Sequence, residues 1–266
     1  MTEIPDVVKK PNPLLIALVA PPNGGKTYFL EHWPNILVLD CEGKLSPTTL
    51  RVPLNDAAFI NKWAKPYCDN PANWRAARPT EASHLALFEW LKKVGPTLTK
   101  PTALALDCFT HLLHSIDAWI DMNRAYFVEP KSGKVNDYAG WKYQLVYWHK
   151  LFTEFKKLSV NTIITFHEEP DKDNTGKLNG RIKALCGGSF KDQIESYWNL
   201  SLRILNKSTP NNPNYRFQLA TDLAWTPRLQ GCHLDTDKLK EKLDKKDGTI
   251  PASYADLREI MIGGII

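Results

Sequence analysis

Residues 20–27 carry the clearest chemical signal in this sequence, because they combine a glycine pair with a lysine and a hydroxyl at fixed spacing. They read Ala-Pro-Pro-Asn-Gly-Gly-Lys-Thr and follow the apolar run Leu14–Ala20. This matches the phosphate-binding pattern GxxxxGK[ST], except that Ala20 stands where the first glycine is expected. In such a loop, backbone N–H groups surround the β-phosphate, Lys26 reaches the β- and γ-phosphate oxygens, and the Thr27 hydroxyl binds Mg²⁺.

The motif therefore predicts ATP and Mg²⁺ as cofactors. A chance Gly-Gly turn before a helix is the alternative, but strand, loop, Lys-Thr and a helix over Lys26–Trp33 occur in the required order. The nucleotide-binding residues that we expect are Ala20, Pro21, Pro22, Asn23, Gly24, Gly25, Lys26, Thr27 and Tyr28.

Two carboxylates follow apolar strands and are candidates to complete the site. Asp107 ends the run Thr102–Asp107, where such ATPases place the acid of the Mg²⁺ shell; capping the helix that begins near Thr110 is the alternative. Cys108 occupies the position where many ATPases have the glutamate that activates water. A different base is then required, and Glu42, two residues after the strand Ile36–Asp40, is our candidate beside the plain alternative of a turn carboxylate.

Apolar β-rich runs alternate with segments of helical period, which predicts an α/β fold with a mostly parallel sheet and helices on both faces. The expected strands are Leu14–Ala20, Ile36–Asp40, Thr102–Asp107, Asn161–Phe166, Leu200–Leu205 and Tyr215–Ala220. The expected helices include Ala82–Val94 and a segment from Trp141 to Leu158. We divide the chain into an N-terminal extension (1–13), a core (14–230) with an irregular insertion at 46–80, and a C-terminal helical tail (231–266).

These blocks, in this order, resemble the RecA/RadA family of P-loop ATPases, and most closely the compact RecA-like ATPases of phages that include single-strand annealing proteins. The resemblance implies a RecA-like P-loop NTPase core, with Glu42 as catalytic base and Asp107 as the Mg²⁺-associated acid beside Thr27. It also implies that His167, at the end of Asn161–Phe166, senses the γ-phosphate, although an ordinary strand-end histidine is an alternative. It further implies that Arg228 reaches a neighbouring subunit's γ-phosphate, against the alternative of an exposed turn arginine.

The loop after the sensor strand contacts single-stranded DNA in the RecA family, and here Glu168–Gly188 is rich in glycine and looks long and mobile. We expect DNA at its basic second half, through Lys177, Arg181 and Lys183. The resemblance implies single-stranded DNA, further copies of this chain and a single-strand-binding protein as partners. It leaves open whether the role is annealing, strand exchange or an accessory one.

Composition is that of a globular protein, with 43% hydrophobic residues, 24% charged residues and a net charge of +5. The sequence contains no run of about 20 apolar residues, so we expect a soluble, cytoplasmic protein, in the host cytoplasm if it is encoded by a phage. The five cysteines form no CxxC pair, and His111 and His114 have no further ligands nearby in the sequence, so neither a disulfide framework nor a zinc site is indicated.

The motifs and the resemblance together favour a DNA-binding ATPase that acts in recombination or single-strand annealing. The first alternative is a P-loop kinase of a small molecule, in which Asp40 serves as the metal-site acid on a strand adjacent to the phosphate-loop strand. The second is a structural or packaging component whose assembly is controlled by ATP and whose hydrolysis is slow. The presence of Lys26, Thr27 and Asp107 disfavours it, because these residues together form an intact site.

Overall fold

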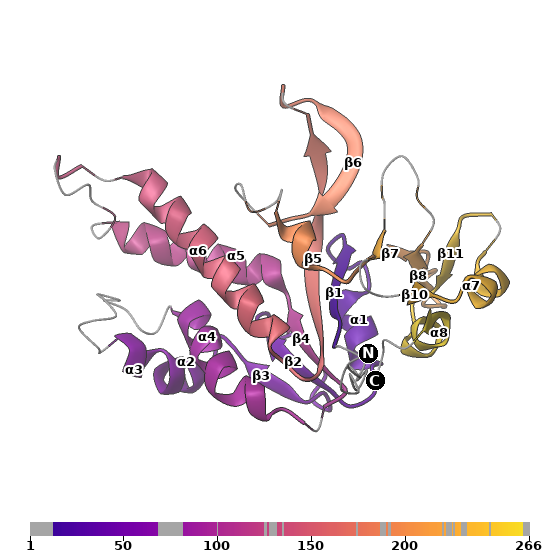
Figure 1. Cartoon of the computed structure of the whole chain (residues 1–266), viewed down its shortest axis with the longest axis horizontal. Helices are drawn as coiled ribbons and strands as arrows, with labels where there is room; N and C mark the ends of the chain where they lie inside the picture. The colour runs from indigo at the N-terminus through magenta and orange to yellow at the C-terminus, as the bar shows by residue number, and fades with distance from the viewer. Residues whose placement is uncertain are drawn as a thin grey trace, which may run out of the picture.

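The structure is a computed structural model of the whole chain, shown in Figure 1. It describes residues 13–68, 82–99, 101–124, 127, 132–134, 136–173, 175–186, 190, 193–219, 221, 225, 227–229, 233–244 and 246–262.

A ten-stranded sheet forms the centre of the fold, with the order β11-β8-β7-β1-β5-β4-β2-β3 along its main path. β6 pairs with β5 and β9 pairs with β7, off that path. The strands are β1 (Leu15–Ala20), β2 (Ile36–Asp40), β3 (Arg51–Pro53), β4 (Ala103–Asp107), β5 (Asn161–Lys172), β6 (Leu178–Ala184), β7 (Leu200–Asn206), β8 (Tyr215–Gln218), β9 (Arg228–Leu229) and β11 (Thr249–Pro251). β10 (His233–Leu234) and β12 (Met261–Ile262) pair separately.

The strands from β3 to β7 along this path pair in parallel, whereas β6, β8, β9 and β11 pair antiparallel. The predicted fold class, α/β with a mostly parallel sheet, is therefore confirmed. β5 separates the phosphate-loop strand β1 from β4, the strand that ends in Asp107. The carboxyl ends of these parallel strands meet at one edge, where ligands bind in open α/β sheets.

Helices cover both faces of the sheet (Figure 1). Alternate residues of β1 point to opposite faces, so Val19 packs in one apolar core with α4, α5 and α6, while Leu18 packs in another with α1 and α8. The helices are α1 (Lys26–Glu31), α2 (Ala57–Trp63), α3 (Lys65–Cys68), α4 (Ser83–Val94), α5 (Phe109–Met122), α6 (Asp137–Lys156), α7 (Thr236–Lys242) and α8 (Tyr254–Ile260), with short 3₁₀ turns at Gly95–Thr97 and Ile194–Tyr197.

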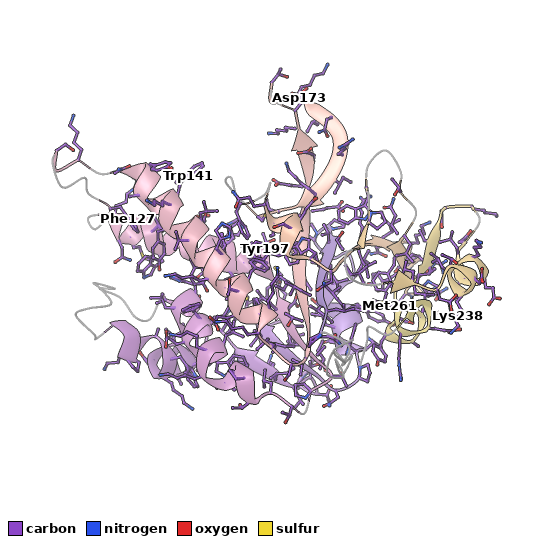
Figure 2. All side chains as sticks on the ribbon, in the orientation of Figure 1. Phe127, Trp141, Asp173, Tyr197, Lys238 and Met261 are labelled. Atoms are coloured by element: carbon purple, nitrogen blue, oxygen red, sulfur yellow. The ribbon has the colours of Figure 1, made fainter. Side chains whose placement is uncertain are left out.

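Most of the expected loop Glu168–Gly188 is a β-hairpin instead, so that prediction was wrong; residues 174, 187 and 188 lie outside the described part. β5 continues past Phe166 to Lys172 and pairs antiparallel with β6, and Glu168 lies opposite Ala184. The glycines that suggested a loop serve the turn and the twist, since Gly176 has φ 82° and Gly180 has φ 79°. The hairpin rises from the body of the molecule in Figure 1, and Figure 2 places Asp173 at its tip.

Parts of the expected insertion and of the expected tail belong to the main sheet. Within the insertion at 46–80, β3 adds a parallel edge strand beside β2, and α2 and α3 follow; residues 69–81 lie outside the described part. Within the tail, β11 pairs with β8. Each helix in the described ranges is too short or too polar to cross a bilayer.

Candidate functional site: the phosphate loop and its facing side chains

The phosphate loop turns sharply between β1 and α1, and two glycines make that turn possible. Gly25 has φ 94°, and a Cβ there would lie 2.3 Å from the ring of Tyr215. A Cβ on Gly24 would lie 2.7 Å from the Cβ of Ala20. Ala20 itself ends β1, so the replacement of the expected glycine fits extended backbone. The loop therefore requires glycine at positions 24 and 25 but not at 20.

The backbone donors of the loop begin at Asn23, because Pro21 and Pro22 carry no N–H. Gly24 N donates to the carbonyl of Pro21 at 2.9 Å, which closes the turn. Gly25 is the N-cap of α1 and no side chain caps the helix, so the first N–H groups of α1 are available to a ligand. A bound phosphate would accept hydrogen bonds from these amides and would lie at the positive end of the helix dipole.

Lys26 lies buried in the loop, with 6% of its surface exposed. Its Nζ donates to the carbonyls of Ala20 at 3.0 Å and Pro21 at 2.9 Å. Burial lowers the pKa of Lys26, and the negative charges of Asp107 and Glu42 oppose that shift. An ammonium group held by neutral carbonyls in a partly desolvated site is well suited to bind an anion.

Asp107 faces the phosphate loop from the end of β4. Its Oδ2 accepts a hydrogen bond from Thr27 Oγ1 at 2.9 Å, and its Oδ1 accepts one from Thr165 Oγ1 at 2.7 Å. Burial raises the pKa of Asp107, while the bonds from Thr165 and Thr27 lower it. The carboxylate does not cap α5, whose N-cap is Cys108. A hydroxyl and a carboxylate oxygen this close form an oxygen donor set of the kind Mg²⁺ prefers.

Glu42 is positioned by a tight turn at the end of β2. Asp40 Oδ1 accepts hydrogen bonds from the backbone N–H of Glu42 at 3.0 Å and of Gly43 at 2.7 Å, and Gly43 has φ 72°. β2 pairs with β3 and with β4, the strand whose Asp107 contacts the phosphate loop. The turn after β2 brings Glu42 into the cavity that the phosphate loop lines.

The Glu42 carboxylate has three polar partners. Lys44 Nζ lies 2.7 Å from Oε2, while Cys108 Sγ and His111 Nε2 each lie 3.1 Å from Oε1. Burial alone raises the pKa of Glu42, but hydrogen bonds from Lys44 and Cys108 and the charge of His111 hold it below its usual value. Glu42 is therefore a carboxylate at neutral pH, the form that accepts a proton from water.

His167 lies on β5 directly opposite Ala20 of β1. Its backbone N–H donates to Thr110 Oγ1 at 3.1 Å, which fixes the strand against α5. Burial and the charge of Lys26 lower the pKa of His167, so the neutral imidazole is the dominant form near pH 7. A neutral ring beside the phosphate loop can donate one hydrogen bond without adding charge.

These side chains line a single cavity of about 340 Å³. That volume is in the range of small-molecule sites. Its lining residues are Pro22, Asn23, Gly24, Gly25, Lys26, Thr27, Tyr28, Glu42, Lys44, Asp107, His167 and Tyr215. The fold thus brings together the ends of β1, β2 and β4 with the middle of β5, and with them most of the nucleotide-site residues expected from the sequence.

The expected DNA-binding residues are not among the described lining residues of this cavity. Lys177 and Arg181 are exposed on the hairpin, whereas Lys183 is half-buried and forms an ion pair with Asp171. Arg228 lies on β9, its backbone opposite Ser201 of β7, and its side chain lies outside the described part.

Sequence reasoning missed several residues of the site. Thr165 supports Asp107 from the neighbouring strand, and Tyr215 covers Gly25 from β8. Thr165 lies two residues before His167 and so shares its face of β5, a signal that could have been used. Nothing local marks Tyr215, because β8 is adjacent to the site only in the folded chain.

A family model described as an AAA domain matches residues 12–226 of the chain. No curated protein matches the chain at a significant level. Among solved structures, the crystal structure of the RadB recombinase is similar, with 13% sequence identity, a TM-score of 0.38, and coverage of 80% of this chain and 83% of that chain. Such a distant likeness says nothing further about function.

Proposed function

The chain belongs to the AAA domain family and is a nucleotide-binding P-loop ATPase, and from this premise we propose that it hydrolyses Mg-ATP to act on single-stranded DNA. The role that we propose is recombination or annealing, as in the compact RecA-like ATPases of phages. One observation carries the proposal for hydrolysis: a single cavity is lined by Lys26, Thr27, Asp107, Glu42 and His167.

Each side chain has a place in this proposal. Lys26 and the amides of Asn23 and of Gly25 to Thr27 would bind the phosphates, and Thr27 and Asp107 would hold the metal ion. Mg²⁺, when bound, neutralises charge on the β- and γ-phosphates. Glu42 orients a water molecule and accepts its proton. His167 lies where it can donate a hydrogen bond to the γ-phosphate.

The hairpin is our proposed DNA-binding element. Arg181 and Lys183 lie on β6, and the exposed Lys177 stands at the turn before them. Cationic side chains on an extended arm suit contacts to successive phosphates without sequence readout.

The base of the hairpin is tied to the ATP site. Glu168, next to His167, accepts two hydrogen bonds from the guanidinium of Arg203 on β7, at 2.9 and 3.2 Å. A movement of the hairpin on DNA binding is therefore transmitted to the backbone of His167. We propose this link as the reason why DNA would stimulate hydrolysis.

The kinase alternative fits the strand order less well. It places the metal-site acid on a strand adjacent to β1, but the neighbours of β1 are β5 and β7, whereas Asp40 ends β2. Asp40 is also engaged in the turn of Glu42 and in an ion pair with Arg51 at 3.4 Å. These contacts favour Asp107 over Asp40 as the proposed metal-site acid.

Phosphate release from ATP, measured with and without single-stranded DNA, tests the proposal. We expect release into water that rises several-fold with DNA, because the hairpin is linked to His167. Release that is unchanged by DNA would remove the DNA role and leave the ATPase. Transfer that depends on a small acceptor, without release into water, would favour the kinase.

A further inference from the structure

Three metal-ligating side chains of different chemistry meet at the carboxyl edge of the sheet. One ligand atom each from Glu42, Cys108 and His167 lies within 4.8 Å of the others. Cys108 Sγ lies 3.1 Å from Glu42 Oε1 and 4.0 Å from His167 Nε2. Glu42 and Cys108 follow the ends of β2 and β4, and His167 lies in the middle of β5, so their grouping is invisible in the spacing of cysteines and histidines along the chain.

We propose that Glu42, Cys108 and His167, with His111, form a site for a thiophilic divalent cation of the Zn²⁺ class, separate from the Mg²⁺ site at Thr27 and Asp107. Occupation of this site holds Glu42 as a ligand and so stops ATP hydrolysis. The regulatory half of this inference rests on the proposed role of Glu42, whereas the binding half rests on geometry alone.

The ligand types select the metal. A thiolate and imidazole nitrogens favour Zn²⁺ and similar ions, while Mg²⁺ takes oxygen ligands. With bonds of about 2.0 to 2.3 Å, the ligands of a tetrahedral zinc ion lie roughly 3.3 to 3.8 Å apart. The separations of 3.1 and 4.0 Å bracket that range, so small side-chain adjustments are enough.

His111 lies outside this group of three, and we assign it as the fourth ligand after a turn of its ring. Its Nε2 lies 3.1 Å from the same Glu42 oxygen that Cys108 contacts, and its side chain is 41% exposed, which leaves it room to turn. Cys108 is the N-cap of α5 and His111 lies in the first turn, so the start of one helix positions both ligands. On binding, the Cys108 thiol loses its proton to solvent and coordinates as the thiolate.

Cobalt binding to the nucleotide-free full chain, in the absence of Mg²⁺, tests the site directly. Co²⁺ takes zinc-like sites and gives a sulfur-to-metal charge-transfer absorption only when a thiolate coordinates it. We expect this absorption in the wild type, reversed by stoichiometric Zn²⁺. Cys108→Ser should abolish the band and weaken Zn²⁺ binding by about a hundredfold or more, since even partners behind a ligand are worth about 10 to 100-fold.

The matched control is Cys41→Ser. Cys41 directly follows β2, and its backbone N–H donates to the carbonyl of Asp107 at 2.7 Å. It therefore lies at the same edge of the sheet, but it is not in the ligand group. It should keep the band and the affinity. A band that survives in Cys108→Ser, or no band in the wild type, overturns the proposal.

Inhibition of Mg-ATP hydrolysis by Zn²⁺ tests the regulatory half of the proposal separately from the metal-binding half. Zn²⁺ should inhibit the wild type and Cys41→Ser at concentrations about a hundredfold lower than those that inhibit whatever activity Cys108→Ser retains. A cobalt band without any ATPase activity in the wild type would refute the proposed function and leave the site standing. Equal inhibition of all three proteins would refute the regulatory half.

Discussion

Thr27 and Asp107 are 80 positions apart in the chain, yet Thr27 Oγ1 donates a hydrogen bond to Asp107 Oδ2 at 2.9 Å. The bond joins the start of α1 to the end of β4 across the intervening strand β5. From β5, Thr165 holds the second oxygen of the same carboxylate at 2.7 Å. The orientation of Asp107, the proposed Mg²⁺ ligand, is thus fixed from both sides. Thr27 would itself contact the metal, whereas Thr165 would not.

The support from Thr165 is the first testable consequence. Thr165→Val keeps the shape of the side chain but removes the hydrogen bond, so Asp107 is less well oriented. We expect the Mg²⁺ concentration for half-maximal ATPase activity to rise by about tenfold, the lower end of the range for partners behind a metal ligand.

Thr162→Val is the matched control for that experiment. Thr162 is a buried threonine of the same strand, and its Oγ1 has no hydrogen-bond partner in the part of the chain that the structure describes. Its replacement should leave the Mg²⁺ requirement unchanged. If both valine variants behave alike, Thr165 does not position Asp107.

The salt dependence of DNA binding tests the hairpin. Replacing Lys177 and Arg181 together by alanine removes two exposed cations. We expect the slope of log affinity against log salt concentration to fall by about 1.4, since each phosphate contact to single strands contributes about 0.7. Lys183→Ala should change the slope less, because Lys183 is already paired with Asp171. An unchanged slope in the double variant removes the hairpin from the DNA site.

The role of Arg228 between subunits predicts a dependence on protein concentration. If its guanidinium completes a neighbour's site, ATPase activity per subunit rises as copies assemble, and Arg228→Ala abolishes that rise while nucleotide binding persists. Arginines delivered in this way are worth about 10³ to 10⁵ in rate. Wild-type turnover by the variant at every concentration would mean that each site is complete within one chain.

Acid stability depends on His84 of α4. The ring is fully buried, Nε2 lies 3.1 Å from Tyr143 Oη, and Nδ1 has no partner among the described residues. Burial lowers the pKa of His84 from 6.5 to about 3. The unfolded chain therefore binds more protons between these two values, and folding stability falls as pH drops through that window, by up to about 1.4 kcal/mol per pH unit.

Chemical unfolding at several pH values measures that loss. His84→Gln should flatten the decline between pH 6.5 and 3, whatever its effect at pH 7. His32→Gln, at an exposed position, serves as the control and should leave the decline as in the wild type. A decline that is equally steep in both variants would assign it to other groups.

The local parts of the site could be predicted from the sequence, and the assembled parts could not. The phosphate loop is one continuous segment, so its strand, glycines, Lys26 and Thr27 are visible in order. Asp107 was recognisable because it ends an apolar strand. Tyr215 acts from a strand that is adjacent to the site only in the sheet, and no local pattern marks it. Thr165 is marked only by its place two residues before His167, and its bond to Asp107 depends on the pairing of β5 with β4.

The hairpin shows how local cues mislead. Pro170, Gly176 and Gly180 are turn-forming residues, and together they predicted a loop at 168–188. Pairing between β5 and β6 overrides that preference, because the ladder satisfies the backbone groups of both segments. The glycines are retained at positions of positive φ within the hairpin, where they do not interrupt it.

The central claim is that Glu42 activates water for hydrolysis of ATP bound at the phosphate loop. A single-turnover experiment on Glu42→Gln, with ATP binding measured in parallel, tests it most directly. Glutamine keeps the size of the side chain but cannot accept a proton, so we expect ATP affinity within a few-fold of wild type and hydrolysis slower by at least about a hundredfold. Lys26→Ala is the reference for a binding defect and should lose most of its ATP affinity. Hydrolysis by Glu42→Gln at the wild-type rate would contradict the account and move the base to another residue.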